Sequence, residues 1–199
     1  MYYFLIPLIL GFASNLASAF TFYYSEKWGR QAGTFITILL RDIFGIPLWA
    51  VGFLLAIKEG EDLFFKGTVL TTITGWSLIA LGGIIIVMAL ITIRSKAAAP
   101  STRDELVHTG LYSVIRHPIH TGTFLEFTGL FVLWPSLTVA IAFVSGVVWI
   151  FFQSKFEELD LKNRIRGYSD YMKSTPPFFP FNRLKKYSKT GFPDSGKFD

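Results

Sequence analysis

The sequence of 199 residues contains no cysteine and only three histidines. Without cysteine the chain has no disulfide, no thiol nucleophile, no iron–sulfur cluster and no cysteine-ligated zinc. Three histidines are too few for the histidine cage of a membrane oxygenase. Charged residues are also scarce, at 17% against roughly 25% in an average soluble chain, while 51% of the residues are apolar. This composition points away from a soluble or disordered protein and allows one compact domain or a small membrane bundle.

Long apolar runs take the place of the missing charge. A bilayer core about 30 Å thick needs roughly 20 apolar helical residues to cross it. No charged residue occurs in residues 1–25 or in residues 67–93, so each run predicts a membrane span. Residues 34–57 predict a third span, in which the adjacent Arg41 and Asp42 neutralise each other. The proline within this span is expected to kink it.

A fourth apolar run predicts a hairpin. Residues 118–153 carry one charge, Glu126, and are too long for a single crossing at 1.5 Å per residue. Two short helices joined at Pro135 fit this run better. We therefore predict an all-α integral membrane protein with about five transmembrane helices, the last two forming a helical hairpin. An unpaired carboxylate in an apolar helix is costly, so we expect Glu126 either to pair with Arg41 or Arg116 or to contact a substrate.

The basic residues predict how the chain lies in the membrane. With five crossings, 16 of the 19 basic residues lie in the first loop, the third loop and the C-terminal segment, and two lie in the second loop. The positive-inside rule then predicts a multi-pass protein with its N-terminus outside and its C-terminus in the cytoplasm. The net charge of +5 is explained by this topology and by contact with membrane lipids, so no nucleic-acid partner is expected. The short chain and uncharged first span favour a prokaryotic plasma membrane, and the oligomeric state stays open.

Two polar clusters are the candidates for chemistry. All three histidines, His108, His117 and His120, lie within 13 residues of the third loop, on the predicted cytoplasmic side. Two of them are three residues apart, but the sequence defines no third ligand, so we expect no metal. The second cluster holds the adjacent Glu157 and Glu158, directly after the last apolar run. Taken alone, this pair is also typical of a solvated helix start, where carboxylates favourably meet the helix dipole.

The residues around the second cluster predict an amphipathic helix over about residues 154–173, which would lie back over the third loop. At helical spacing one face of it carries Glu158, Leu161, Ile165, Tyr168 and Met172. A proline pair, Pro176 and Pro177, is expected to end this helix. Arg164 and Arg166 are interpreted as interfacial anchors.

Together the two clusters resemble a known family. The segment of residues 105–122, ELVHTGLYSVIRHPIHTG, resembles the loop of the isoprenylcysteine carboxyl methyltransferase and phospholipid methyltransferase superfamily. That loop has a leucine-valine step, then a glycine, a tyrosine and an arginine-histidine-proline step, and a glutamate pair, a leucine, tyrosines and a proline-aromatic end follow the last membrane helix. The matching residues here are Leu106, Val107, Gly110, Tyr112, Arg116, His117, Pro118, Glu157, Glu158, Leu161, Tyr168, Tyr171 and the segment 178–181. The resemblance covers roughly residues 100–181.

The resemblance implies an integral membrane enzyme that transfers a methyl group from S-adenosylmethionine to a lipophilic acceptor entering from the bilayer. The cofactor would lie between the cytoplasmic loop and the C-terminal helix. By this resemblance the cofactor-binding residues are Leu106, Val107, Gly110, Tyr112, His117, Pro118, His120 and Glu157. Arg116 and Glu158 would be the catalytic residues, which orient the acceptor or take a proton. Carboxylates and aromatic faces suit a cofactor that carries a sulfonium and an ammonium group.

The resemblance also sets the domain prediction. We expect a single membrane methyltransferase domain over residues 1–181, with the N-terminal spans in residues 1–93 and the cofactor-binding part in residues 94–181. Residues 182–199 are predicted to be a basic, flexible tail.

Three departures from the family pattern bear on the substrate. His120 stands where the family commonly has a tyrosine, and Ile165-Arg166 replaces an aromatic-glycine step. Gln153 stands where the carboxyl methyltransferases have an arginine that is associated with the substrate carboxylate. The Gln153 departure weakens the expectation of a prenylcysteine substrate and leaves that of the cofactor largely intact, whereas His120 offers either a different contact to the cofactor or a base near neutral pH.

Four functions follow from this reasoning. The expected one is methylation of a lipophilic acceptor, most like protein-S-isoprenylcysteine carboxyl O-methylation, and the first alternative is N-methylation of a phospholipid amine. An NADPH-dependent membrane sterol-type reductase is a second alternative, because that class shares the arginine-histidine-proline step. A non-catalytic membrane binding protein is the third.

Overall fold

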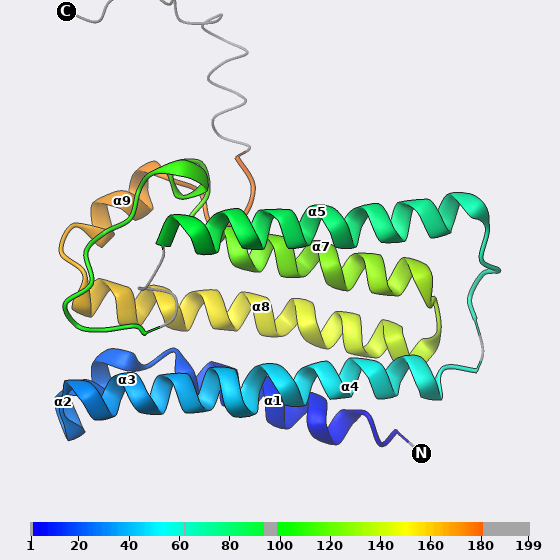
Figure 1. Ribbon diagram of the computed structural model, residues 1–199, viewed down its shortest axis with the longest axis horizontal. Coiled ribbons are helices and arrows are strands. Elements are labelled where there is room, and N and C mark those ends of the chain that lie inside the picture. The colour runs from blue at the N-terminus through cyan, green and yellow to red at the C-terminus, as the bar shows by residue number, and fades with distance from the viewer. Residues whose placement is uncertain (1, 62, 94–98, 181–199) are drawn as a thin grey trace, which may run out of the picture.

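The computed structural model describes residues 2–61, 63–93 and 99–180. Long helices run side by side along the longest axis of the molecule, and α9 lies at one end of them (Figure 1). In chain order the elements are α1 (Leu5–Ser18), α2 (Thr21–Trp28), α3 (Arg30–Ile38), the π-helical η1 (Leu39–Gly45), α4 (Ile46–Glu59), α5 (Val69–Ile93), the short 3₁₀ helix η2 (Gly110–Ser113), α7 (Pro118–Leu133), α8 (Leu137–Arg164) and α9 (Tyr168–Ser174). The predicted all-α membrane architecture is confirmed, but the predicted number of about five transmembrane helices is not, since three helices of the described residues, or four with a bent pair, are long and apolar enough to cross a membrane.

The apolar runs form helices of unequal length. Three helices in the described residues are long and apolar enough to cross a membrane: the continuous helix Arg30–Glu59, which joins α3, η1 and α4, then α5, and α8. The first predicted span is not straight, because α1 and α2 meet at a bend of 63° and make a fourth span only if the bent pair crosses together. With 16 residues, α7 is about 24 Å long and is the short member of the bundle.

The third predicted span is irregular where its charges lie. Arg41 Nε and Nη2 donate to the carboxylate of Asp42 at 2.7 and 2.9 Å, so the expected mutual neutralisation of the two side chains is confirmed. Both residues belong to η1, the π-helical stretch that precedes Pro47. A proline removes one helical hydrogen bond and clashes with the carbonyl one turn earlier, and the wider π turn accommodates this loss.

Close packing of α5 against α7 depends on pairs of glycines. A Cβ atom added to Gly82 would lie 2.5 Å from the carbonyl oxygen of Gly122, and one added to Gly129 would lie 2.6 Å from that of Gly75. The glycines on each helix are seven residues apart, so they share one face and let the two backbones touch. This contact holds α7, and with it His120 and Glu126, in a fixed position.

The hairpin is confirmed, but the amphipathic helix after it is not a separate element. Ser136 caps α8 and accepts a hydrogen bond from the backbone N–H of Val139 at 3.4 Å. The last span then continues unbroken to Arg164, so the prediction of one helix over residues 154–173 is wrong. The chain turns at Gly167, whose φ of +81° favours glycine, and α9 follows.

The apolar face that suggested the amphipathic helix does exist across this break. Ile165, Tyr168 and Tyr171 form a small buried cluster on which Leu106 and Met172 pack. The cluster fastens α9 to the loop that precedes α7. Phe178, in the proline-aromatic segment, packs on the main core and beside the ring of His117. The predicted tail and Phe181 lie outside the described residues.

Candidate functional site

One end of the bundle encloses a cavity of about 770 Å³. The loop before α7, the helix α9 and the end of α8 gather there (Figure 1). Its lining combines polar residues, among them Glu157 and His120, with apolar residues, among them Ile46 and Trp49 of α4 and Leu90 of α5. The charged residues Arg41, Asp42 and Glu126 also line it. A cavity of this volume lies within the range of about 300 to 1,000 Å³ typical of sites for small molecules.

A buried ion pair joins α8 to the loop. Arg116 Nη2 lies 2.7 Å from Glu158 Oε1, and the two side chains are only 7% and 4% exposed. The same guanidinium donates through Nη1 to the backbone oxygens of Met172 and Thr175, at 2.7 and 2.5 Å. Lys155 Nζ lies 3.3 Å from the other Glu158 oxygen. All of these contacts are to protein groups, so Glu158 is satisfied by the fold itself.

Backbone hydrogen bonds continue this connection. The N–H groups of Arg116 and His117 donate to the carbonyl oxygens of Pro176 and Pro177, each at 2.9 Å. The segment after α9 therefore runs beside the arginine-histidine-proline step, and residues about 60 positions apart in sequence are held together at this point.

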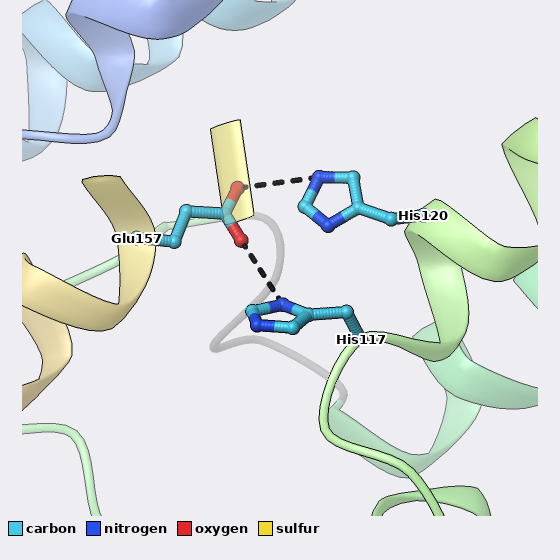
Figure 2. A group of neighbouring side chains, drawn as sticks. All are labelled: His117, His120 and Glu157. Atoms are coloured by element: carbon cyan, nitrogen blue, oxygen red, sulfur yellow. Dashed lines mark ion pairs between the residues drawn. The ribbon is translucent and has the colours of Figure 1, made fainter. Parts of the chain in front are cut away.

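Two imidazole rings converge on Glu157. His117 Nδ1 lies 3.7 Å from Glu157 Oε2, and His120 Nε2 lies 3.6 Å from Glu157 Oε1. Figure 2 shows the two imidazole rings, carried by the start of α7, pointing at the carboxylate from α8. Gln153 Nε2 donates to Glu157 Oε1 at 2.9 Å. Unlike Glu158, the Glu157 side chain is about one-third exposed, and its carboxylate lines the cavity.

Arg164 connects three segments of the chain, and its interpretation as an interfacial anchor is wrong. Its Nε donates to Asp160 Oδ2 at 2.6 Å, and its Nη1 donates to Asp104 Oδ2 at 2.8 Å. The other oxygen of Asp160 accepts from the backbone N–H of Phe22 in α2 at 2.6 Å. Side-chain exposure of Arg164 is only 10%, so the guanidinium points into the protein.

Tyrosines close the cavity from the side of α9. The hydroxyl of Tyr171 donates to the backbone oxygen of Tyr112 at 2.5 Å. Burial raises the pKa of Tyr112 above its ordinary value, and the negative charge of Glu157 raises it further. Burial also raises the pKa of Tyr168 and that of Tyr171, the latter to about 12. These phenols therefore stay neutral hydrogen-bond donors at physiological pH.

Comparison with known proteins agrees with this geometry. Residues 70–165 match the family described as phospholipid methyltransferase. Protein-S-isoprenylcysteine O-methyltransferase B of Arabidopsis thaliana is 33% identical over 146 residues, which cover 67% of this chain and 74% of that protein. The chain belongs to this superfamily of membrane methyltransferases.

A second relative of this chain is the nickel-cobalt-cadmium resistance protein NccN of Alcaligenes xylosoxydans xylosoxydans. It is 31% identical over 96 residues, which cover 47% of this chain and 45% of the relative, so the match spans less than half of that protein. No solved structure matches the chain significantly.

Most of the residues predicted for the site meet at the cavity of this methyltransferase family member. The residues that line it are Leu106, Val107, Tyr112, Arg116, His117, His120 and Glu157. Three others are not among the lining residues. Pro118 is buried as the first residue of α7, Gly110 turns the loop with a φ of +56°, and Glu158 holds Arg116.

Other lining residues were not predicted as part of the site. Asp160 and Arg164 follow Glu157 at intervals of three and four residues, so one face of α8 carries all three, and this spacing was the available signal. Glu126 also lines the cavity. In the described residues Arg41 forms an ion pair with Asp42, and Arg116 forms one with Glu158. Neither of these pairs is the predicted ion pair with Glu126.

Proposed function

We propose that the chain is an S-adenosylmethionine-dependent methyltransferase that acts on a lipophilic acceptor. The observation that carries this proposal is the mixed lining of the cavity, in which the Glu157 carboxylate and neutral phenols occur together with apolar side chains of α4 and α5, here called the apolar flank. A cationic, water-soluble cofactor and an apolar acceptor need such a combination. Following the distribution of basic residues, we place the polar residues on the cytoplasmic side, where the cofactor is available.

The polar residues suit the cofactor. S-adenosylmethionine carries a sulfonium and an ammonium group, and carboxylates and aromatic faces favour both. Glu157 offers a carboxylate whose protein hydrogen bond comes from Gln153 alone among the described residues. Five polar atoms of lining residues are buried without a hydrogen-bond partner in the described part of the chain: Asn15 Nδ2, Trp49 Nε1, His120 Nδ1, Trp149 Nε1 and Gln153 Oε1. Buried polar groups are normally satisfied, so these atoms are suited to a bound ligand.

When bound, the cofactor supplies an electrophilic methyl group on its sulfonium sulfur. The chain contributes position and exclusion of water, because displacement at a methyl carbon needs little covalent help. In this proposal Glu157 binds the cofactor's ammonium or ribose groups, and Leu106 and Val107 contact it mainly through the backbone. Arg116 and Glu158 act as positioning residues, because Glu158 does not line the cavity and both groups bind each other.

The apolar flank suits the acceptor. It consists of Ile46 and Trp49 of α4 and of Ile86, Leu90 and Ile93 of α5. A prenylated cysteine carboxylate is the first acceptor class to test, because the Arabidopsis relative is named for isoprenylcysteine O-methylation. A phospholipid amine is the second, because the matching family is described as phospholipid methyltransferase.

Calorimetric binding to the detergent-purified protein tests the cofactor. S-adenosylmethionine is expected to bind, and Glu157→Gln is expected to weaken binding by about 1.5 to 3 kcal/mol, the range for a hydrogen bond to a charged group. Asp170→Asn is the matched control, since it removes an exposed carboxylate of α9. NADPH binding in place of S-adenosylmethionine would move the chain to a reductase, and binding of neither would favour a non-catalytic membrane protein.

The acceptor is tested separately with a labelled methyl group. A farnesylated cysteine with a free carboxylate and vesicles of phosphatidylethanolamine are offered in parallel to the same preparation. Base-labile label in the first product identifies carboxyl methylation, and base-stable label in the phospholipid identifies N-methylation. Cofactor binding without labelling of either would leave the cofactor part standing and reject both acceptors.

A further inference from the structure

The cluster of His117, His120 and Glu157 has the geometry of a metal site. The candidate ligand atoms of the three residues lie within 4.8 Å of one another. The two nitrogen–oxygen separations, 3.7 and 3.6 Å, are too long for hydrogen bonds. Ligands bound to one tetrahedral ion at about 2.0 to 2.2 Å are roughly 3.3 to 3.5 Å apart, so a bound ion would draw the three ligand atoms somewhat closer together. Figure 2 shows the resulting gap between the carboxylate and the two rings.

The surroundings of His117 orient it as a ligand. Its Nε2 lies 3.1 Å from Glu158 Oε1, and that carboxylate is held by Arg116. A carboxylate accepts only, so this contact places the ring proton on Nε2 and leaves the Nδ1 lone pair facing Glu157. Metal-binding histidines in proteins are commonly oriented in this way by a second carboxylate.

His120 makes no hydrogen bond within the described residues. Its Nδ1 is buried without a hydrogen bond, and its Nε2 makes only the 3.6 Å contact with Glu157. The ring is held by packing, edge-on to Trp149 at a centroid distance of 6.1 Å. A buried imidazole that no hydrogen bond satisfies is costly, and a bound ion at Nε2 would compensate for part of that cost.

We propose that His117 Nδ1, His120 Nε2 and Glu157 bind one divalent transition-metal ion. Two neutral imidazoles and one carboxylate are the ligand set that suits zinc, cobalt or nickel, whereas magnesium and calcium prefer oxygen ligands alone. All three residues line the cavity, so the remaining coordination position faces it and accepts water or another ligand. From the sequence alone no third ligand was evident. The fold supplies it by bringing α8 against the start of α7.

The metal shares Glu157 with the proposed cofactor site. A dication at this carboxylate repels a second cation, so metal and S-adenosylmethionine are expected to compete. This consequence rests on the proposed function, whereas metal binding itself does not.

Cobalt titration tests the site directly. The full chain is purified in detergent with an affinity tag that contains no histidine, is stripped with a chelator, and is titrated with Co²⁺ while its visible absorption is followed. We expect one Co²⁺ per chain, with intense bands typical of low coordination number, and displacement by Zn²⁺. His120→Tyr and Glu157→Gln are expected to weaken Co²⁺ binding at least about tenfold, because each removes a ligand.

Two controls make the result decisive. His108→Ala removes the third histidine, which is exposed and outside the cluster, and is expected to bind Co²⁺ like the parent protein. Thermal unfolding of each variant shows whether it is folded, and His120→Tyr keeps an aromatic ring against Trp149. Absence of Co²⁺ binding by the parent, or equal binding by folded His120→Tyr and Glu157→Gln, would overturn the proposal. Intact Co²⁺ binding that S-adenosylmethionine does not weaken would instead count against the cofactor's use of Glu157.

Discussion

Glu157 and Glu158 are neighbours on α8, yet they lie in opposite environments. The Glu158 side chain is 4% exposed and contacts Arg116, His117 and Lys155. The Glu157 side chain is 33% exposed, accepts a hydrogen bond from Gln153, and faces the cavity. A buried carboxylate must be fully paired, whereas a partly exposed one tolerates free acceptor capacity. Two residues of the same type therefore differ in role because of their surroundings: protein cations pair with Glu158, whereas Glu157 faces the cavity.

The two acids therefore act at different levels of the same site. Glu158 holds Arg116, and Arg116 holds the carbonyl oxygens of Met172 and Thr175. That connection keeps the loop, α8 and the segment after α9 together, so it shapes the wall from which Glu157 projects. Loss of Glu158 should therefore destabilise the fold, whereas loss of Glu157 should weaken ligand binding in the cavity.

The isosteric change of each acid to its amide is the sharpest test of this comparison. Glu158→Gln leaves the buried Arg116 guanidinium without its counter-charge and is expected to lower the free energy of unfolding by roughly 3 to 5 kcal/mol. Glu157→Gln is expected to change it by about 0.5 kcal/mol or less. Chemical unfolding in a detergent micelle, followed by tryptophan fluorescence, measures both. Equal losses in the two variants would show that the acids share one structural role.

Arg164 extends the comparison, because it is a buried cation whose partners lie at the edge of the cavity. Arg164→Met removes charged hydrogen bonds to Asp104 and Asp160 and is expected to cost about 1.5 to 3 kcal/mol of unfolding free energy. Arg166→Met is the matched control, since Arg166 lies two residues later and is exposed. The same unfolding measurement should show no change for the control, and an equally small change in both variants would restore the interpretation of Arg164 as an interfacial anchor.

The membrane spans and the cavity-lining loop could be predicted because local rules fix them. A bilayer requires long apolar helices. Residues 67–93 therefore predict α5, and the apolar run broken at Pro135 predicts the hairpin of α7 and α8. The loop motif likewise grouped Leu106, Tyr112 and His117, and all three residues line the cavity.

What the sequence left undetermined depends on contacts between distant segments. Apolar spacing continues from Leu161 through Ile165 to Met172, so periodicity alone could not show that α8 ends at Arg164. Gly167, which takes a positive φ, was the local signal for that turn. The contact of His120 with Glu157 joins α7 to α8, and no spacing within either helix predicts it.

The smallest loss of stability expected for a buried partner comes from Tyr171, a neutral residue that also lines the cavity. Its hydroxyl donates to the backbone oxygen of Tyr112, and Tyr171→Phe is expected to cost about 1 kcal/mol, the usual net contribution of one hydrogen bond. Burial raises the pKa of Tyr171 from 10.0 to about 12. Because the unfolded chain releases this proton first, the stabilisation is complete below about pH 10 and decreases as the pH rises toward about 12.

Thermal unfolding at about pH 8 and about pH 11 checks this sign. The parent protein is expected to lose stability at the higher pH, and Tyr171→Phe is expected to lose less, because it has no phenol to titrate at this position. The variant keeps part of the loss, since burial also raises the pKa values of Tyr112 and Tyr168. An identical loss of stability at alkaline pH in the parent and the variant would mean that deprotonation of Tyr171 does not destabilise the fold. The contrast between structural and ligand-binding groups would then rest on the charged residues alone.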